Sequence, residues 1–234
     1  MPVHETIMTR EHYLNLLREL DDAILDMGDS VAITIASCIE ALEQRDIVRA
    51  KQLIEADSRI DAERYGIENQ ALLLIATQQP LASDLRTIVS ILTIATELER
   101  IGDYCEGIAK LTLRMAAEPE LGPLSDIRSM SQITQRLMGQ SLEAYRNRDV
   151  EAAGKVWMQD DEVDALYEQV FREIIAEMAA DPNTVRRGTY LLWVAHNLER
   201  MADRVTNIAE RVAFVVTGDL ATFRNALSAQ TLPK

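Results

Sequence analysis

Long helical patterns with few interruptions dominate the sequence. Apolar residues recur every three or four positions, as on the buried face of an α-helix, for example at Leu14, Leu17, Leu20 and Ile24. Only 9 glycines and 6 prolines occur in 234 residues, whereas an average protein has roughly 12% of the two together. Because glycine and proline end helices and form turns, their scarcity predicts an all-α protein built from long helices.

A few positions interrupt the pattern and set the predicted helix boundaries. Asp46 and Asp149 each precede a helical run, which is typical of N-cap residues. Pro80 and Pro182 mark further boundaries, and Gly218 is predicted to end the last long helix. The predicted helices span residues 9–44, 46–79, 81–116, 125–147, 149–180 and 183–217.

The two halves of the sequence are copies of each other. Residues 40–50 align with 143–153 at an offset of 103, and residues 99–103 align with 199–203 at an offset of 100. Each copy contains three of the predicted helices. The duplication therefore predicts two tandem, structurally repeated three-helix bundles.

This repeat gives the predicted domain organisation. Residues 1–117 form the first three-helix bundle and residues 125–218 form the second. The linker between them is placed at 118–124, because this segment contains two prolines and a glycine. Residues 219–234 are predicted to be a frayed C-terminal tail.

Each half carries two pairs of acidic residues spaced four positions apart on a predicted helix, so that both members of a pair share one face. Like charges at this spacing repel each other by roughly a few tenths of a kcal/mol. Such a cost, repeated four times, calls for a reason. The eight residues are Asp57, Asp61, Glu99 and Asp103 in the first half, and Asp160, Asp164, Glu199 and Asp203 in the second half.

An antiparallel hairpin turning at Pro80 would place the two acidic pairs of the first half level with each other. Asp61 and Glu99 each lie 19 residues from Pro80, and Asp57 and Asp103 each lie 23 residues from it. The second half has the same symmetry about its own Asp-Pro turn. We therefore expect two groups of four carboxylates, which we name the first quartet and the second quartet.

Carboxylates gathered at one level favour hard cations, because the positive charge offsets their mutual repulsion. The sequence predicts a cation site in each half, holding magnesium, manganese, calcium, oxidised iron or, with less typical ligands, zinc. Asp161 and Asn207 are candidate additional ligands. The alternative is that the acids face water or pair with arginines. Arg100 and Arg200, each three residues before a quartet aspartate, are the candidates for that pairing.

Composition and missing motifs narrow the function. The formal net charge of −14 argues against binding nucleic acid or anionic membranes. No apolar run approaches the ~18 residues of a membrane span, and the N-terminus lacks a secretion signal, so we expect a cytoplasmic protein without membrane insertion. The sequence also lacks the Glu-x-x-His signature of di-iron bundles, a phosphate-binding glycine loop and a nucleophile elbow. The missing di-iron signature counts against an oxidase or ferroxidase, and our leading interpretation is a protein that binds partners and is not an enzyme.

The motifs resemble those of the PhoU family of bacterial phosphate-uptake regulators. Residues 78–86 read Gln-Gln-Pro-Leu-Ala-Ser-Asp-Leu-Arg, and residues 98–103 read Leu-Glu-Arg-Ile-Gly-Asp. In the second half, residues 197–203 read Asn-Leu-Glu-Arg-Met-Ala-Asp. The resemblance implies two three-helix bundles, a homodimer, and metal clusters that fall on Glu99, Asp103, Glu199 and Asp203 with the other four acids opposite.

The resemblance also implies a function. Family members act as negative regulators of phosphate uptake and of the phosphate-starvation response. They serve as adaptors between the ATPase subunit of a phosphate ABC transporter and a sensor histidine kinase. From the residues alone, a metal-dependent enzyme or a metal-storage bundle stays open as an alternative. A purely structural bundle with solvated acids is a third reading.

Overall fold

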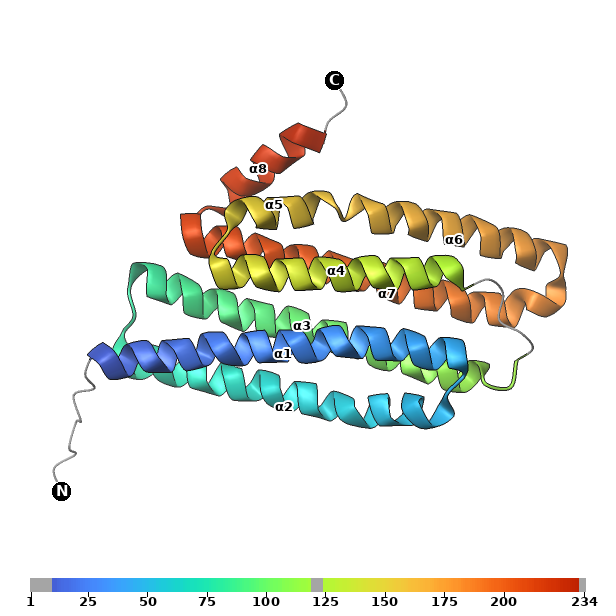
Figure 1. Ribbon diagram of the computed structural model, residues 1–234, viewed down its shortest axis with the longest axis horizontal. Coiled ribbons are helices and arrows are strands. Elements are labelled where there is room, and N and C mark those ends of the chain that lie inside the picture. The colour runs from blue at the N-terminus through green and yellow to red at the C-terminus, as the bar shows by residue number, and fades with distance from the viewer. Residues whose placement is uncertain (1–9, 119–123, 232–234) are drawn as a thin grey trace.

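The computed structural model describes residues 10–118 and 124–231, and every regular element in these ranges is helical (Figure 1). The all-α prediction is confirmed. The helices of the first half are α1 (Arg10–Gln44), α2 (Ile47–Gln78) and α3 (Ala82–Met115). Those of the second half are α4 (Ser125–Asn147), α5 (Val150–Met158), α6 (Asp161–Ala180), the short 3₁₀ helix η1 (Pro182–Thr184), α7 (Val185–Thr217) and α8 (Leu220–Thr231). The predicted linker at 118–124 falls mainly on residues 119–123, which lie outside the described ranges.

The same turn opens the second helix of each half. Arg45 and Arg148 both have a backbone φ of 54°, in the left-handed region. The aspartates that follow, Asp46 and Asp149, each accept a hydrogen bond from the backbone N–H three residues later, at 2.9 and 3.0 Å. The predicted N-caps are therefore confirmed, and the repeated sequence produces a repeated turn.

The other predicted boundaries also hold. Helix α2 ends at Gln79, which is left-handed with a φ of 48°, and Pro80 follows it. Pro182 begins η1 between α6 and α7. Helix α7 ends at Gly218, whose φ of 76° suits glycine because no side chain is strained there.

The helix predicted over residues 149–180 is divided. Helix α5 ends at Met158, and α6 begins at Asp161 after a turn in which the Val163 N–H donates to the Asp160 carbonyl. The reason is the run of acids in this segment. A helix N-terminus stabilises negative charge, so acids are better placed in the first turn of a new helix than in the middle of a long one.

The predicted frayed tail at residues 219–234 is wrong for the part that the structure describes, because α8 is a helix. Asp219 accepts a hydrogen bond from the backbone N–H three residues later, at 3.0 Å, as an N-cap does. Phe223 and Leu227 are buried and lie next to Gly154 of α5. These two apolar side chains pack α8 on the second bundle, and the Arg224 guanidinium donates hydrogen bonds to both oxygens of the buried Glu210 of α7.

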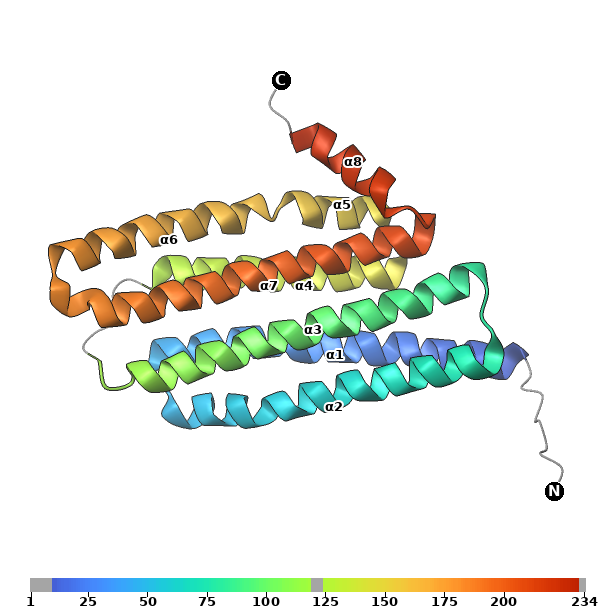
Figure 2. The ribbon, with the colours of Figure 1, turned by 180° about the vertical axis from the view of Figure 1, so that it is seen from behind.

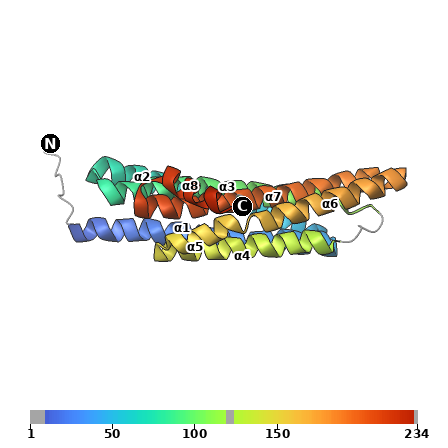
Figure 3. The same cartoon turned by 90° about the horizontal axis from the view of Figure 1, so that it is seen from above.

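The two bundles pack side by side. Helices α3 and α7 run next to each other in opposite directions through the middle of the molecule (Figure 2), while α1 and α4 pack together on the other side (Figure 3). A Cβ atom on Gly28 of α1 would lie only 2.6 Å from the Leu142 side chain of α4, so glycine allows this close approach. None of the described helices is both long enough and apolar enough to cross a lipid bilayer.

A buried glutamate joins α3 to α7. Glu97 accepts hydrogen bonds from the Arg204 guanidinium at 3.3 Å and from the Asn207 amide at 3.2 Å. The equivalent contact at the other end of the repeat differs: a Cβ on Gly107 would lie 3.1 Å from the amide nitrogen of Asn197. The α3–α7 interface therefore has the charged contact of Glu97 with Arg204 on one side. On the other side, it has the neutral approach of Asn197 to Gly107.

A second polar contact joins α1 to the end of α4. Asp21 accepts a hydrogen bond from the Tyr145 hydroxyl at 2.6 Å, and both of its oxygens accept from the Arg148 guanidinium at 2.9 Å. The Arg148 guanidinium also lies 4.2 Å from the centre of the Tyr145 ring. We name these three residues the Asp21 clasp. Asp21 lies more than 120 positions before Tyr145 and Arg148 in the sequence, so the Asp21 clasp connects the two bundles directly.

Candidate metal centres

The α2–α3 hairpin brings the first quartet together. Asp57 and Asp61 come from α2, and Glu99 and Asp103 come from α3. Negative charge on Asp61 raises the pKa of both α3 acids, which shows that the two helices present these side chains to each other. Three of the four are half-buried and Asp103 is exposed, so the quartet lies at the surface of the bundle and is accessible to solvent.

Three carboxylates of the first quartet, those of Asp57, Glu99 and Asp103, have raised pKa values. Burial, followed by repulsion from neighbouring acids, raises the pKa of Asp57 to about 6. The pKa values of Glu99 and Asp103 are also raised, again mainly by burial. The folded chain therefore favours neutralisation of this site, by protons or by another positive charge.

Arg64 and Arg100 partly compensate the charge of the first quartet, and one further acid extends it. The Arg64 Nε lies 3.5 Å from a Glu99 oxygen. Glu106 on α3 raises the pKa of Asp57 and Asp103 by its charge, although it also pairs with Lys110. The sequence analysis missed Glu106. Its position three residues after Asp103, on the same helix face, was the signal that could have found it.

The second quartet is assembled from α6, α7 and the turn before α6. Burial, followed by repulsion from Asp164 and Asp203, raises the pKa of Asp160 to about 7. The pKa values of Asp164 and Glu199 are raised for the same reasons. One oxygen each of Asp160 and Glu199 is buried and has no hydrogen-bond partner. A buried carboxylate oxygen without a donor is costly, and an oxygen-binding cation would satisfy it.

The alternative reading, neutralisation by arginine, is correct in part. Arg200 donates a hydrogen bond to an Asp203 oxygen at 3.0 Å, as the spacing suggested. Its Nε also lies 3.8 Å from the buried Glu199 oxygen that lacks a hydrogen-bond partner, and the His196 Nδ1 lies 3.6 Å from that same oxygen. One guanidinium offsets one of four negative charges, so the second quartet keeps a net negative charge.

The two candidate additional ligands lie in different places. Asp161 is the first residue of α6, and its charge raises the pKa of Asp160 and Asp164, so it borders the second quartet. Asn207 instead directs its amide nitrogen to Glu97 of α3. Its amide group is therefore engaged at the interface between the two bundles.

Each quartet concentrates negative charge, but its carboxylates are not arranged closely enough to coordinate a cation. Across residues 10–118 and 124–231, no three His, Cys, Asp or Glu side chains come together closely enough to hold a metal ion as they stand. The donor set nevertheless suits a hard cation, because it consists of carboxylates on surface-facing helices with buried oxygens that lack partners. Binding would require rotation of side chains, chiefly those of the arginine-paired acids.

The raised pKa values predict an unusual pH dependence for the cation-free protein. Because Asp57 and Asp160 titrate at about 6 and about 7 when folded, they contribute stability that is present below about pH 4 and lost as the pH rises to about 7. The chelator-treated protein should melt several degrees higher at about pH 5 than at about pH 8. Asp57→Asn together with Asp160→Asn should shrink this difference, as differential scanning calorimetry would measure. A melting temperature that rises steadily from about pH 5 to about pH 8 would contradict the prediction.

Both repeats match one family of proteins. The model described as "PhoU domain" matches residues 24–112 and again residues 127–212. A Clostridium acetobutylicum protein named phosphate-specific transport system accessory protein PhoU homolog is 38% identical over 212 residues, which is 90% of this chain and 97% of the relative. A Caulobacter vibrioides protein with the same name is 38% identical over 215 residues, which is 92% of this chain and 94% of the relative.

Solved structures agree with the sequence matches. The crystal structure of the phosphate transport system regulatory protein PhoU from Streptococcus pneumoniae superposes with a TM-score of 0.84 at 30% identity, over 89% of this chain and 99% of that chain. The crystal structure of PhoU from Pseudomonas aeruginosa gives a TM-score of 0.85 at 30% identity, over 88% of this chain and 100% of that chain. Sequence and fold therefore point to the same relatives over nearly the whole length.

Proposed function

Because the chain belongs to the PhoU family, we propose that it is a regulatory accessory protein of phosphate transport, which acts by binding partners and not by catalysis. The observation that carries the proposal is the match over both repeats, together with 38% identity to relatives named as accessory proteins of a phosphate-specific transport system. The regulation is negative: the protein restrains phosphate uptake and the phosphate-starvation response when phosphate is plentiful. It acts in the cytoplasm as a homodimer.

The partners follow from this role. They are the ATPase subunit of a phosphate ABC transporter and a sensor histidine kinase. An adaptor of this kind needs surfaces that recognise proteins, and it needs no reacting groups. A long, solvent-accessible helical surface with a large negative charge suits recognition of partners that carry positive charge.

The two quartets are the proposed metal sites of this regulator. Asp57, Asp61, Glu99 and Asp103 would hold iron, manganese, magnesium or zinc in the first bundle. The second quartet would do so in the second bundle, with Asp161 as a bordering acid. When bound, the cation supplies positive charge that ties α2 to α3 and α6 to α7. The buried Asp160 oxygen without a hydrogen-bond partner and the raised pKa values of Asp57 and Asp160 support this assignment.

Deleting the gene in its source bacterium tests the regulatory role. In phosphate-rich medium, the deletion strain should take up more labelled phosphate and should express starvation-induced phosphatase at a level several-fold above the parent strain. A plasmid copy of the gene should restore repression. Unchanged uptake and unchanged phosphatase in the deletion strain would contradict the proposal.

A further inference from the structure

A continuous groove runs between α1 and α2, on the outer side of the first bundle. It consists of three adjoining hollows of about 220, 410 and 230 Å³. Gln70 lines both the first and the second hollow, and Ser30, Arg59 and Glu63 line both the second and the third. The groove therefore extends from the end of α2 near Thr77 to the edge of the first quartet at Asp57.

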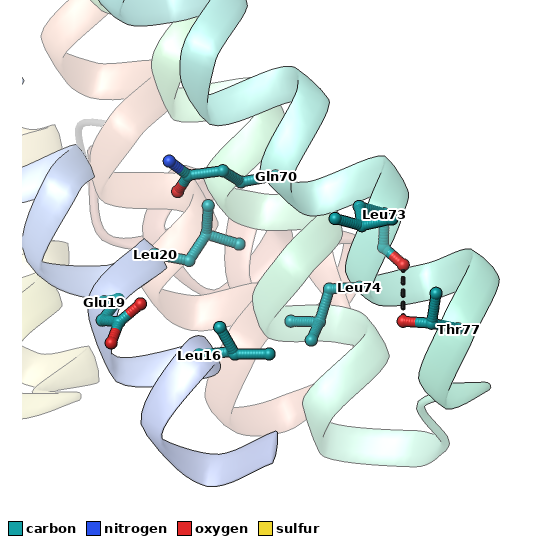
Figure 4. Close-up of a pocket in the computed structure, with 7 residues that line it drawn as sticks. All are labelled: Leu16, Glu19, Leu20, Gln70, Leu73, Leu74 and Thr77. Atoms are coloured by element: carbon teal, nitrogen blue, oxygen red, sulfur yellow. Dashed lines mark hydrogen bonds between the residues drawn. The ribbon is translucent and has the colours of Figure 1, made fainter. Parts of the chain in front are cut away.

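The floor of the groove is apolar. At its first end, Leu16 and Leu20 of α1 face Leu73 and Leu74 of α2 (Figure 4). Further along, the floor is formed by Met27, Ile60 and Ile67, all of which are buried. At its two ends stand exposed apolar side chains, with Leu73 63% exposed and Ile33 67% exposed. Apolar area of this kind at a surface is typical of a site that another protein covers.

Small residues keep the middle of the groove open. Ala23 and Ser30 line it from α1, and Gly66 lines it from α2. A Cβ atom added to Gly66 would meet no other atom within 4 Å, so the space above this glycine is empty. A helix can approach another closely where side chains are this small.

The groove is strongly acidic along its length. Five carboxylates line it, of which Glu63 pairs with Arg59 at 3.1 Å and Glu106 pairs with Lys110, so that, within the described part of the chain, the charges of Glu19, Asp26 and Asp57 stay without such a pair. An acidic helix could not approach without repulsion, whereas a basic one would be attracted. The acids are Glu19, Asp26, Asp57, Glu63 and Glu106.

We infer that this groove is a docking surface for a basic amphipathic helix of a partner protein. The apolar side of such a helix, with anchors three and four residues apart, would lie on the floor, and its lysines or arginines would meet the acidic edges. The lining of α1 runs from Leu16 to Thr34, so the matching helix has about 18 residues and is about 27 Å long. The inference rests on the proposed regulatory function only in that it names the surface through which a partner is recognised.

The second bundle has a hollow between α4 and α5. Its polar lining side chains carry mixed charge: Gln140, Glu143, Asn147, Asp149, Lys155 and Gln159. Gly139 lines this hollow, and its Cβ position is also empty within 4 Å. The chain therefore provides a matched control for any substitution at Gly66.

Fluorescence anisotropy on the full chain tests the inference. The probe is a labelled synthetic peptide of about 18 residues, made of leucine and lysine with the leucines three and four positions apart. Gly66→Leu should weaken its binding about tenfold or more by filling the groove, whereas Gly139→Leu should change it less than about twofold. Leucine forms helices better than glycine, so neither variant should unfold, which circular dichroism would check.

Two further peptides decide what drives binding. A peptide of the same composition with its leucines scrambled off one helix face should bind about tenfold more weakly, and one with glutamate in place of lysine should not bind. Equal binding of the ordered and scrambled peptides, equal effects of the two leucine variants, or no binding of the ordered peptide would each overturn the inference. None of these outcomes would alter the phosphate uptake of the deletion strain, so a failure here is distinct from a failure of the proposed regulatory function.

Discussion

Alanine in place of Asp21 should lower the free energy of unfolding by about 3 kcal/mol, which makes it among the most damaging single changes outside the apolar core. The substitution removes the acceptor of the Tyr145 hydroxyl and both acceptors of the Arg148 guanidinium. Tyr145 is 1% exposed, so its hydroxyl would stay buried without the acceptor that Asp21 provides. Chemical denaturation followed by circular dichroism would measure the loss.

The neighbouring residue provides the control for the Asp21 clasp. Asp22 is exposed, sits on the same helix and carries the same charge. Asp22→Ala should therefore change the free energy of unfolding by less than about 0.5 kcal/mol. If the two alanine variants were equally stable, the clasp would contribute nothing to the association of the bundles.

Amides in place of Glu199 and Asp203 should remove about half of the cation that the purified protein retains, because they disable the second quartet and leave the first intact. Glu99→Gln with Asp103→Asn should remove the other half, and all four changes together should remove nearly all of it. Elemental analysis after loading with manganese or iron and desalting would measure the content. Asparagine and glutamine keep the size of the side chains, so any loss reports on charge and coordination.

The same substitutions should change the melting temperature in opposite directions with and without bound cation. Without it, the Glu199→Gln/Asp203→Asn variant should melt at a higher temperature than the parent, because repulsion within the quartet is relieved. With cation present, the parent should melt higher, because a ligand bound to the folded state stabilises it. Asp22→Asn with Asp29→Asn removes the same net charge from α1 and should show neither effect. Full retention of cation by the quartet variants would end the metal proposal.

Local signals in the sequence predicted much of the fold and the composition of the quartets. Asp46 and Asp149 were identified as caps because a short polar side chain before an apolar helical run has few other roles. The two quartets were predicted from spacing alone, because a hairpin at Pro80 fixes which residues of α2 and α3 stand level. Both inferences depend on neighbours within one repeat.

The features that the sequence did not predict depend on contacts between distant segments. The docking of α8 places Phe223 and Leu227 against Gly154 of α5, and the Asp21 clasp joins positions more than 120 residues apart. The orientation of Asn207 toward Glu97 is fixed by the packing of α3 against α7. Helical periodicity shows that a residue faces a neighbour, but it does not show which neighbour.

The uneven contacts along the α3–α7 interface mean that the two halves of the gene are no longer interchangeable. A chimaera made of two copies of the first half would confront Glu97 with a second Gly107, which has no side chain to donate a hydrogen bond to the buried carboxylate. One made of two copies of the second half would set Asn197 against Asn207 and leave Arg204 without its acid. The interface therefore favours the pairing of one first half with one second half, as occurs within a single chain.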